Sequence, residues 1–458
     1  MQPLRSLSLS WRLGVGLGLA LGSAALAPVQ AQSLVELLNA ARSYDAPWQS
    51  AKAQLDASVA RADQARAGLL PSAALSGSVS RAHNELSAST LPSRATSGMT
   101  TQSVGINASQ PLYRPANRIA LQQGLHGVDL ARAQLDAATQ DLLVRVSQGY
   151  FDVLAAQDTL TFVQAQKAAV SEQLAAAKRN FEVGTSTVTD SREAQARFDL
   201  VRAQEIAAEN DLRVKNLALD QLVGKDATQP LPLATPLPPL PLLALEPDNV
   251  AAWVQQAQDA TTQPLLRQAA IALAVAELET QKAQTGHLPT VDLQAGYNVQ
   301  RSPNGTMTLP GVNSRVNNAS IGVALNLPLF AGFAVQNRVK ETLALQDKVR
   351  ADFDDLRRTL AQNTRAAFYG VQSGQGQVKA LEAAELSSQS ALEANQLGYQ
   401  VGVRINIDVL NAQSQLYQTK RDLAQARYNL LLGKLKLRQA AGTLTEADVQ
   451  AINALLQP

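Results

Sequence analysis

The feature that most constrains this chain is an internal repeat with a spacing of 218 residues. An aromatic residue, a Val-Gly pair and an Asp occur within Arg179–Asp190, and the same set recurs 218 positions later within Leu397–Asn411. Each segment separates two long stretches of helical periodicity. Gly readily ends a helix, and an Asp six residues later can cap the next helix. We therefore predict two helical hairpins, with tips at about 181–190 and 399–408.

Other matching segments lie at the same spacing. Gly68-Leu69-Leu70-Pro71 matches Gly286-His287-Leu288-Pro289, and Tyr150-Phe151 matches Phe368-Tyr369. An ordered repeat of this kind indicates two similar halves rather than unrelated domains. The predicted organisation is a first repeat at 32–223, a Pro-rich linker at 224–247, a second repeat at 248–445 and a short C-terminal tail at 446–458.

The chain begins with the features of a secretory signal peptide at 1–31. Two arginines precede an apolar run from Leu13 to Leu26, and Val29-Gln30-Ala31 supplies the small residues of a cleavage site. The alternative, an N-terminal membrane anchor, is disfavoured because the apolar run is short. Once this segment is removed, 38 basic residues balance 38 acidic ones, so charge predicts no nucleic-acid partner.

The residue types and run lengths of the mature chain exclude several other features. The chain has no cysteine, which excludes disulfides and thiol-bound metal. No later segment has the continuous apolar run, about 18–20 residues, of a transmembrane helix. Any contact with a membrane is therefore expected from another kind of element.

Alternation with a period of two predicts a pair of strands in each half. In the second half, apolar residues at 291–299 and 321–329 alternate with polar or small ones, which predicts strands at about 288–300 and 316–330. Weaker alternation predicts strands at about 71–81 and 102–113. The polar segments His83–Thr101 and Arg301–Asn318 are predicted to be the connecting loops.

Helical periodicity covers most of the remaining sequence. A first helix is expected over Leu34–Ala67, and long helices over about Pro115–Phe181 and Val335–Tyr399. At 1.5 Å per residue, each long helix would be on the order of 100 Å, which is typical of a coiled-coil body. The fold class is therefore α+β, with four amphipathic strands and long coiled-coil helices in two repeats.

Each predicted strand has about the length of a tilted membrane-spanning strand, with one apolar and one polar face. Four strands cannot close a water-filled barrel, and open edges are costly in lipid. Three copies would supply twelve strands. The alternative, a soluble chain with a small sheet packed on a helical bundle, is disfavoured by the signal peptide and by the length of the helices.

The order of elements, the Leu-Pro strand starts, the two Val-Gly tips and the Ala441-Gly442-Thr443-Leu444 ending resemble the TolC family of outer-membrane channel-tunnels. The resemblance covers essentially the whole mature chain. It implies a homotrimer in which twelve strands form a β-barrel in outer-membrane lipid and the helices form a periplasmic tunnel. It further implies passive export in type I secretion or multidrug efflux, with a periplasmic adaptor and an inner-membrane ABC or RND-type transporter as partners.

The same resemblance implies roles for residues at the tips. Tyr399 and Arg404 match family residues that hold the tunnel shut by binding partners that match Thr189 and Asp190. A carboxylate can accept from both a phenol and a guanidinium, and the Arg bond is charge-assisted. Asp190 could instead serve only as a helix N-cap, and Tyr399 only as a packing residue; cap and gate roles are compatible.

Two further sets of residues follow from the resemblance. A secondary gate link matches Gln173 and Arg427, but the Glu of the family pattern is replaced here by Gln396, which weakens that link. The pore constriction matches Asp408 and Asn411, so one of two acidic rings is retained; three carboxylates around an axis should attract cations. Asp408 could alternatively be only a helix cap.

Nothing in the sequence favours catalysis, so we expect no enzyme activity, cofactor or metal site. The histidines are scattered, at His83, His126 and His287. Two other classes of protein remain as alternatives: a periplasmic adaptor with a coiled-coil hairpin, and a structural coiled-coil protein of the cell envelope. An adaptor would normally have one hairpin within a β-rich domain, whereas this chain predicts two hairpins.

Overall fold

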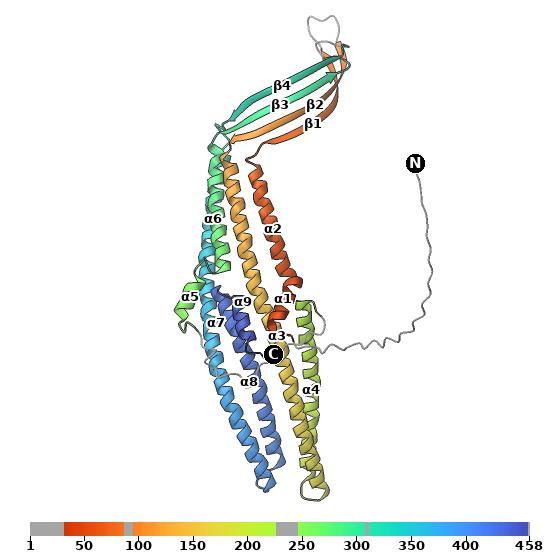
Figure 1. Ribbon diagram of the computed structural model, residues 1–458, viewed down its shortest axis with the longest axis vertical. Helices are drawn as coiled ribbons and strands as arrows, with labels where there is room; N and C mark the ends of the chain where they lie inside the picture. Colours follow the sequence, from red (N-terminus) through yellow and green to blue (C-terminus); the bar gives the residue numbers. More distant parts are fainter. Residues whose placement is uncertain (1–31, 87–94, 226–245, 307–310, 457–458) are drawn as a thin grey trace, which may run out of the picture.

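A computed structural model describes residues 32–86, 95–225, 246–306 and 311–456. The predicted signal peptide and most of the Pro-rich linker lie outside these residues. The chain is strongly elongated, with a four-stranded sheet at one end and long helices that run from the sheet to two hairpin tips at the other end (Figure 1). Short helices lie beside the middle of the helical body.

The two repeats have the same order of elements. The first contains α1 (Leu34–Tyr44), α2 (Ala46–Ala67), β1 (Ser72–Leu86), β2 (Ala95–Tyr113), α3 (Pro115–Glu182) and α4 (Val188–Val223). The second contains α5 (Val250–Ala257), α6 (Pro264–Gln284), the short 3-10 helix η2 (Thr285–His287), β3 (Thr290–Ser302), β4 (Ser314–Asn326), α7 (Ala334–Gln400) and α8 (Asn406–Ala441), followed by α9 (Glu446–Asn453). Helix α8 begins and ends 218 residues after α4, so the sequence repeat is also a structural one.

The first helix differs from its predicted continuous form because it breaks at Asp45. This residue is extended, and its carboxylate accepts a hydrogen bond of 2.9 Å from the backbone N–H of Trp48 at the start of α2. Pro47 has no N–H to continue the backbone hydrogen bonds of α1. The chain therefore starts a second helix, α2, which Asp45 caps. The second repeat has a matching break between α5 and α6.

The strands also differ from their predicted bounds. Pairing extends to Leu86 and Ala95 in one hairpin and to Ser302 and Ser314 in the other, so both connections are shorter than predicted. Strand β4 ends at Asn326 rather than near residue 330, because Pro328 has no N–H to donate to a strand ladder. The predicted tail contains α9, which lies against α1; the backbone N–H of Leu34 donates to Asn453 at 3.0 Å.

The sheet is antiparallel with the order β1-β2-β3-β4, which leaves β1 and β4 as its edges among the described strands. One transverse row aligns Leu75, Ile106, Tyr297 and Ala319. This face is apolar and largely exposed in the single chain; Ile321 is 78% exposed and Leu325 is 68% exposed. The opposite face carries serines and asparagines. The predicted two-faced alternation is confirmed in the sheet register.

The helices form a layer of hairpins with one main core. Helix α3 packs on α4 and α7 packs on α8, and α3 also contacts α8 where the two hairpins meet. The largest buried cluster joins α1, α3, α4, α8 and α9 near the middle of the molecule, with Tyr150 and Leu435 among its most buried side chains. Among the helices that the structure describes, none combines the length and apolar composition needed to cross a membrane.

Candidate functional site: the hairpin tips and the seam between the hairpins

The two tips have the same backbone geometry. Gly184 and Gly402 each have a φ of 77°, the left-handed conformation that ends a helix and that side chains with a Cβ rarely adopt. Helices α3 and α7 end just before these glycines, and α4 and α8 begin four residues after them. The predicted tips at 181–190 and 399–408 are therefore turns between long helices.

In the first tip, Asp190 belongs to a capping box. Thr187 is the N-cap of α4, and its hydroxyl accepts from the backbone N–H of Asp190 at 3.2 Å. The Asp190 carboxylate accepts in return from the backbone N–H of Thr187 at 3.0 Å, from the Thr187 hydroxyl and from the Ser186 hydroxyl. Burial raises the Asp190 pKa, but these bonds outweigh it and hold the pKa below its ordinary value. Asp190 is thus the third residue of the helix rather than the N-cap itself.

The second tip lacks this box. The position equivalent to Thr187 is Ile405, which has no side-chain oxygen, so α8 begins without a side-chain cap. Asp408 occupies the same place as Asp190, and its carboxylate lies 3.7 Å from the Arg404 guanidinium. The interpretation of Asp408 as a helix cap is therefore wrong in this geometry. Its carboxylate is available to the groove described next.

Arg404, Asp408 and Asn411 line one groove of about 610 Å³ between α7 and α8. Ser387, Ser388 and Asn395 line its α7 side. The Asn411 amide oxygen also accepts from Arg197 of α4 at 2.7 Å, a contact between the two hairpins. The structure thus brings both predicted constriction residues and the predicted Arg of the gate together, and it adds Arg197, for which the sequence repeat offered no signal.

The remaining gate residues are placed as follows in the single chain. The Tyr399 hydroxyl accepts from the Asn180 amide of α3 at 3.3 Å, and its ring packs beside Leu392, Val409 and Leu416. Thr189 is exposed on the first turn of α4. Tyr399 therefore joins the two hairpins through Asn180, and the described residues show no hydrogen bond between Tyr399 and Asp190 within one chain.

The two residues of the predicted secondary link bind different partners within one chain. Gln173 of α3 donates to Asn406 of α8 at 2.5 Å, whereas Arg427 of α8 binds Glu382 of α7 at 3.0 Å. Arg427 thus has a charged partner within its own hairpin, and Gln173 joins the two hairpins. Because Arg427 and Glu382 are separated by 45 residues, no local sequence pattern indicates their pairing.

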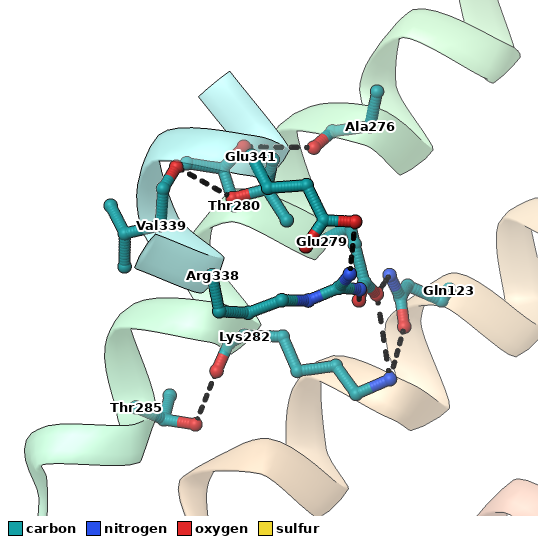
Figure 2. A network of polar contacts seen from close by, with 10 residues as sticks. Gln123, Ala276, Glu279, Thr280, Lys282, Thr285, Arg338, Val339 and Glu341 are labelled. Atoms are coloured by element: carbon teal, nitrogen blue, oxygen red, sulfur yellow. Dashed lines mark hydrogen bonds and ion pairs between the residues drawn. The ribbon is translucent and has the colours of Figure 1, made fainter. Parts of the chain in front are cut away.

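A further polar network joins three helices in the part of the helical body that lies near the sheet (Figure 2). Glu279 of α6 accepts from Gln123 of α3 at 2.9 Å and from Arg338 of α7 at 2.8 Å, so one carboxylate joins three helices. Lys282 lies 3.4 Å from the same carboxylate. The Gln123 bond, then Arg338 and Lys282, hold the Glu279 pKa below its ordinary value despite partial burial.

The described residues contain no group of three or more His, Cys, Asp or Glu side chains that could hold a metal ion.

The solved structures show the fold. The CmeC outer membrane channel of Campylobacter jejuni superposes on this chain with a TM-score of 0.77 at 17% sequence identity, covering 98% of this chain and 99% of that chain. A four-stranded sheet on long paired helices is therefore the fold of an outer-membrane channel.

The relatives define the family. Outer membrane protein TolC of Vibrio cholerae is 34% identical over 429 residues, which cover 94% of this chain and 95% of the relative. Proteases secretion protein PrtF of Dickeya chrysanthemi is 29% identical, covering 97% of this chain and 94% of the relative. The pattern of the outer membrane efflux protein family matches residues 37–225 and 253–443, one segment in each repeat. The chain belongs to this family; it is an outer-membrane protein that extends into the periplasm.

Proposed function

We propose that three copies of this chain form a passive exit duct through the outer membrane, with the sheets joined in a twelve-stranded barrel and the helices forming a periplasmic tunnel. The observation that carries the proposal is the sheet itself. It has an exposed apolar face and two edge strands, β1 and β4, among the described residues. In lipid, unpaired backbone groups on those edges cost several kcal/mol each, so β1 of one copy should pair with β4 of the next.

The substrate proposed first is a secreted protein, because PrtF is by its name a secretion protein for proteases and is similar over nearly the whole chain. Small-molecule efflux is the second candidate, supported by the family description. Either cargo requires energy from elsewhere, since the chain offers only a path. We therefore propose a periplasmic adaptor and an inner-membrane ABC or RND-type transporter as partners.

The gate is proposed at the tips. The three bonds accepted by Asp190 all use Oδ2, which leaves Oδ1 for a further donor. Arg404 is exposed and bound only loosely to Asp408, at 3.7 Å, so its guanidinium can reach a carboxylate on an adjacent copy. Tyr399 lies at the second tip, near the end of α7, and Thr189 lies at the first tip, on the first turn of α4. Asp408 and Asn411, in the groove beside Arg404, are proposed to line the constriction.

The test is a planar-bilayer recording of the protein extracted from outer membranes. The proposal expects outer-membrane fractionation, heat-modified migration and discrete single-channel steps. A chain that fractionates with the periplasm and never yields steps would overturn it. Co-purification from cells after cross-linking would then identify which inner-membrane transporter accompanies the channel.

A further inference from the structure

The seam between the α3/α4 hairpin and the α7/α8 hairpin contains Asp158, whose carboxylate is hydrogen-bonded to a tyrosine of the other hairpin. The hydroxyl of Tyr428 on α8 donates a hydrogen bond of 2.7 Å to the Asp158 carboxylate on α3. Tyr428 is 4% exposed, and its ring packs on Phe151 with the ring centroids 5.8 Å apart. The bond therefore lies within the main core, above the tips, and joins one hairpin to the other.

The charged and titratable groups around Asp158 come from four helices. Helix α8 supplies Tyr428 and Arg427, and α7 supplies Glu382, which binds Arg427 at 3.0 Å. On α3, Tyr150 belongs to the same buried cluster as Tyr428. Asp152, also on α3, binds Lys215 of α4 at 3.4 Å, which is a contact within one hairpin. Asp158 thus differs from Asp152 in that its partner belongs to the other hairpin.

Part of the seam contains buried amide groups that are only partly hydrogen-bonded. Gln173 binds Asn406, but the other amide atom of Asn406 has no hydrogen-bond partner among the described residues. The same holds for the amide oxygens of Gln166 on α3 and Gln413 on α8, which lie two helical turns above that pair. All three side chains are at most 4% exposed. Buried polar groups without partners cost free energy, so these amides weaken the packing of α3 on α8.

We propose that Asp158 and Tyr428 form a proton-sensitive latch between the hairpins: protonation of Asp158 tightens the contact of α3 with α8, and ionisation loosens it. This inference rests on the proposed duct, in which the hairpins must shift for cargo to pass. The latch would make the closed arrangement depend on periplasmic pH.

The direction follows from linkage. Burial raises the Asp158 pKa above its ordinary value, against opposing contributions from the Tyr428 hydroxyl and the Arg427 charge. The packed seam therefore binds the proton more tightly than separated hairpins do. The stabilisation is complete below the ordinary Asp value, about pH 4, and is lost as the pH rises through the raised value.

The chain has no cysteine, so introduced cysteines can be labelled selectively. Spin labels at Thr161→Cys on α3 and Gln425→Cys on α8, both exposed positions, would report the distance between the hairpins. The full mature protein would be reconstituted in nanodiscs, with labelled subunits diluted by unlabelled ones. We expect the long-distance population to grow as the pH rises from about 4 to about 8, by up to about tenfold for each unit of pKa difference.

Three variants decide the matter. Asp158→Asn keeps an acceptor for Tyr428 without a charge, so its distance distribution should stay narrow at every pH. Tyr428→Phe removes a group that lowers the Asp158 pKa, so the midpoint should move to higher pH. Asp152→Asn, the matched control, should respond as the parent does. An Asp158→Asn protein with the parental pH response, or an unmoved midpoint in Tyr428→Phe, would overturn the latch.

Failure of the latch can be told apart from failure of the duct. Single-channel recordings on the same preparations report the duct directly. If steps are seen and the distances ignore pH, the latch is wrong and the duct stands. If the distances follow pH and no steps are seen, the seam responds to protons but the proposed duct is wrong, and with it the role given to the latch.

Discussion

Thr187 and Ile405 occupy the same N-cap position in the two repeats, and Thr187 alone of the two has a hydroxyl to cap its helix. The preceding position also differs, with Ser186 in the first repeat and Arg404 in the second, and the two differences together bind Asp190 into its own tip and leave Asp408 beside Arg404. Two tips with the same backbone therefore present different carboxylates: one bound through a single oxygen by its own tip, the other open to a groove.

The first prediction concerns this cap. Thr187→Val should destabilise the first tip by about 0.5–2 kcal/mol, because it leaves the backbone N–H of Asp190 without its acceptor. Ile405→Val is the matched control and should change little. Hydrogen exchange of the first turns of α4 and α8 would measure both. Equal exchange in the two variants would show that the capping box contributes nothing to the tip.

The gate predicts a gain of conductance. Tyr399→Phe combined with Arg404→Ser removes the phenol and guanidinium proposed to hold the tips together, while the helices stay intact. Single-channel conductance should rise relative to the parent. Tyr369→Phe, an exposed change elsewhere on α7, serves as the control. An unchanged conductance in a correctly assembled double variant would show that neither residue belongs to the gate at the tips.

The constriction predicts block by multivalent cations. Asp408→Asn should abolish block of the channel by a trivalent cation added from the periplasmic side. Asn411→Asp should deepen block, since the added carboxylates lie within the screening length of roughly 8–10 Å. Because Arg197 contacts Asn411 at 2.7 Å, it would partly neutralise the new charge. Asn411→Asp with Arg197→Gln should therefore block more deeply than Asn411→Asp alone.

Current titrations with the same cation would check this series. Parental block in Asp408→Asn would place Asp408 outside the constriction. If Asn411→Asp with Arg197→Gln were blocked more weakly than Asn411→Asp alone, Arg197 would not be neutralising the carboxylate at position 411.

The apolar face of the sheet predicts where charge is not tolerated. Leu325 and Val323 are 68% and 64% exposed on that face, so Leu325→Arg or Val323→Arg should each destabilise the membrane-inserted chain by about 2–4 kcal/mol at mid-bilayer depth. Asn326→Arg, on the polar face, should be tolerated. Heat-modified migration of outer-membrane extracts would score assembly. Normal assembly of the first two variants with loss of the third would reverse the inside and outside of the barrel.

The network in Figure 2 predicts a pH dependence of opposite sign to that of the latch. The Glu279 pKa is lowered, chiefly by the Gln123 hydrogen bond, so its contribution to stability is present above the ordinary Glu value and is lost as the pH falls through the lowered one. Because Glu279 and Arg338 are both partly exposed, Glu279→Gln should lower the free energy of unfolding by only about 0.5–1 kcal/mol near neutral pH. In acid it should not change the free energy of unfolding. Thermal unfolding followed by helical circular dichroism would measure this difference, with Asp354→Asn, an exposed position of α7 away from this network, as the control. A difference that persists in acid would contradict this assignment.

Much of the fold could be predicted because it follows from periodicities and turn residues. The repeat located both tips, and the period of two located the four strands and their two faces. The break at Asp45 was missed because Ala-rich periodicity continues across it, while the cap and Pro47 decide the local geometry. Strand ends were missed where polar residues pair as well as apolar ones do in an exposed hairpin.

The site was less predictable because its contacts are non-local. Asp408 and Asn411 were indicated by the family resemblance, which matches them to two positions one turn apart on one helix. Their partners, and those of the rest of the seam, come from helices far away in the sequence: Arg197 is 214 residues from Asn411, and Asp158 is 270 residues from Tyr428. Single residues of common types carry no pattern, so only the fold reveals such pairs.

The central claim is that three chains close the barrel that one chain cannot. Native mass spectrometry of the protein released from outer-membrane extracts would test this most directly. The account predicts one assembly with three times the mass of the mature chain. A stable, membrane-extracted species with the mass of one or two chains would contradict it.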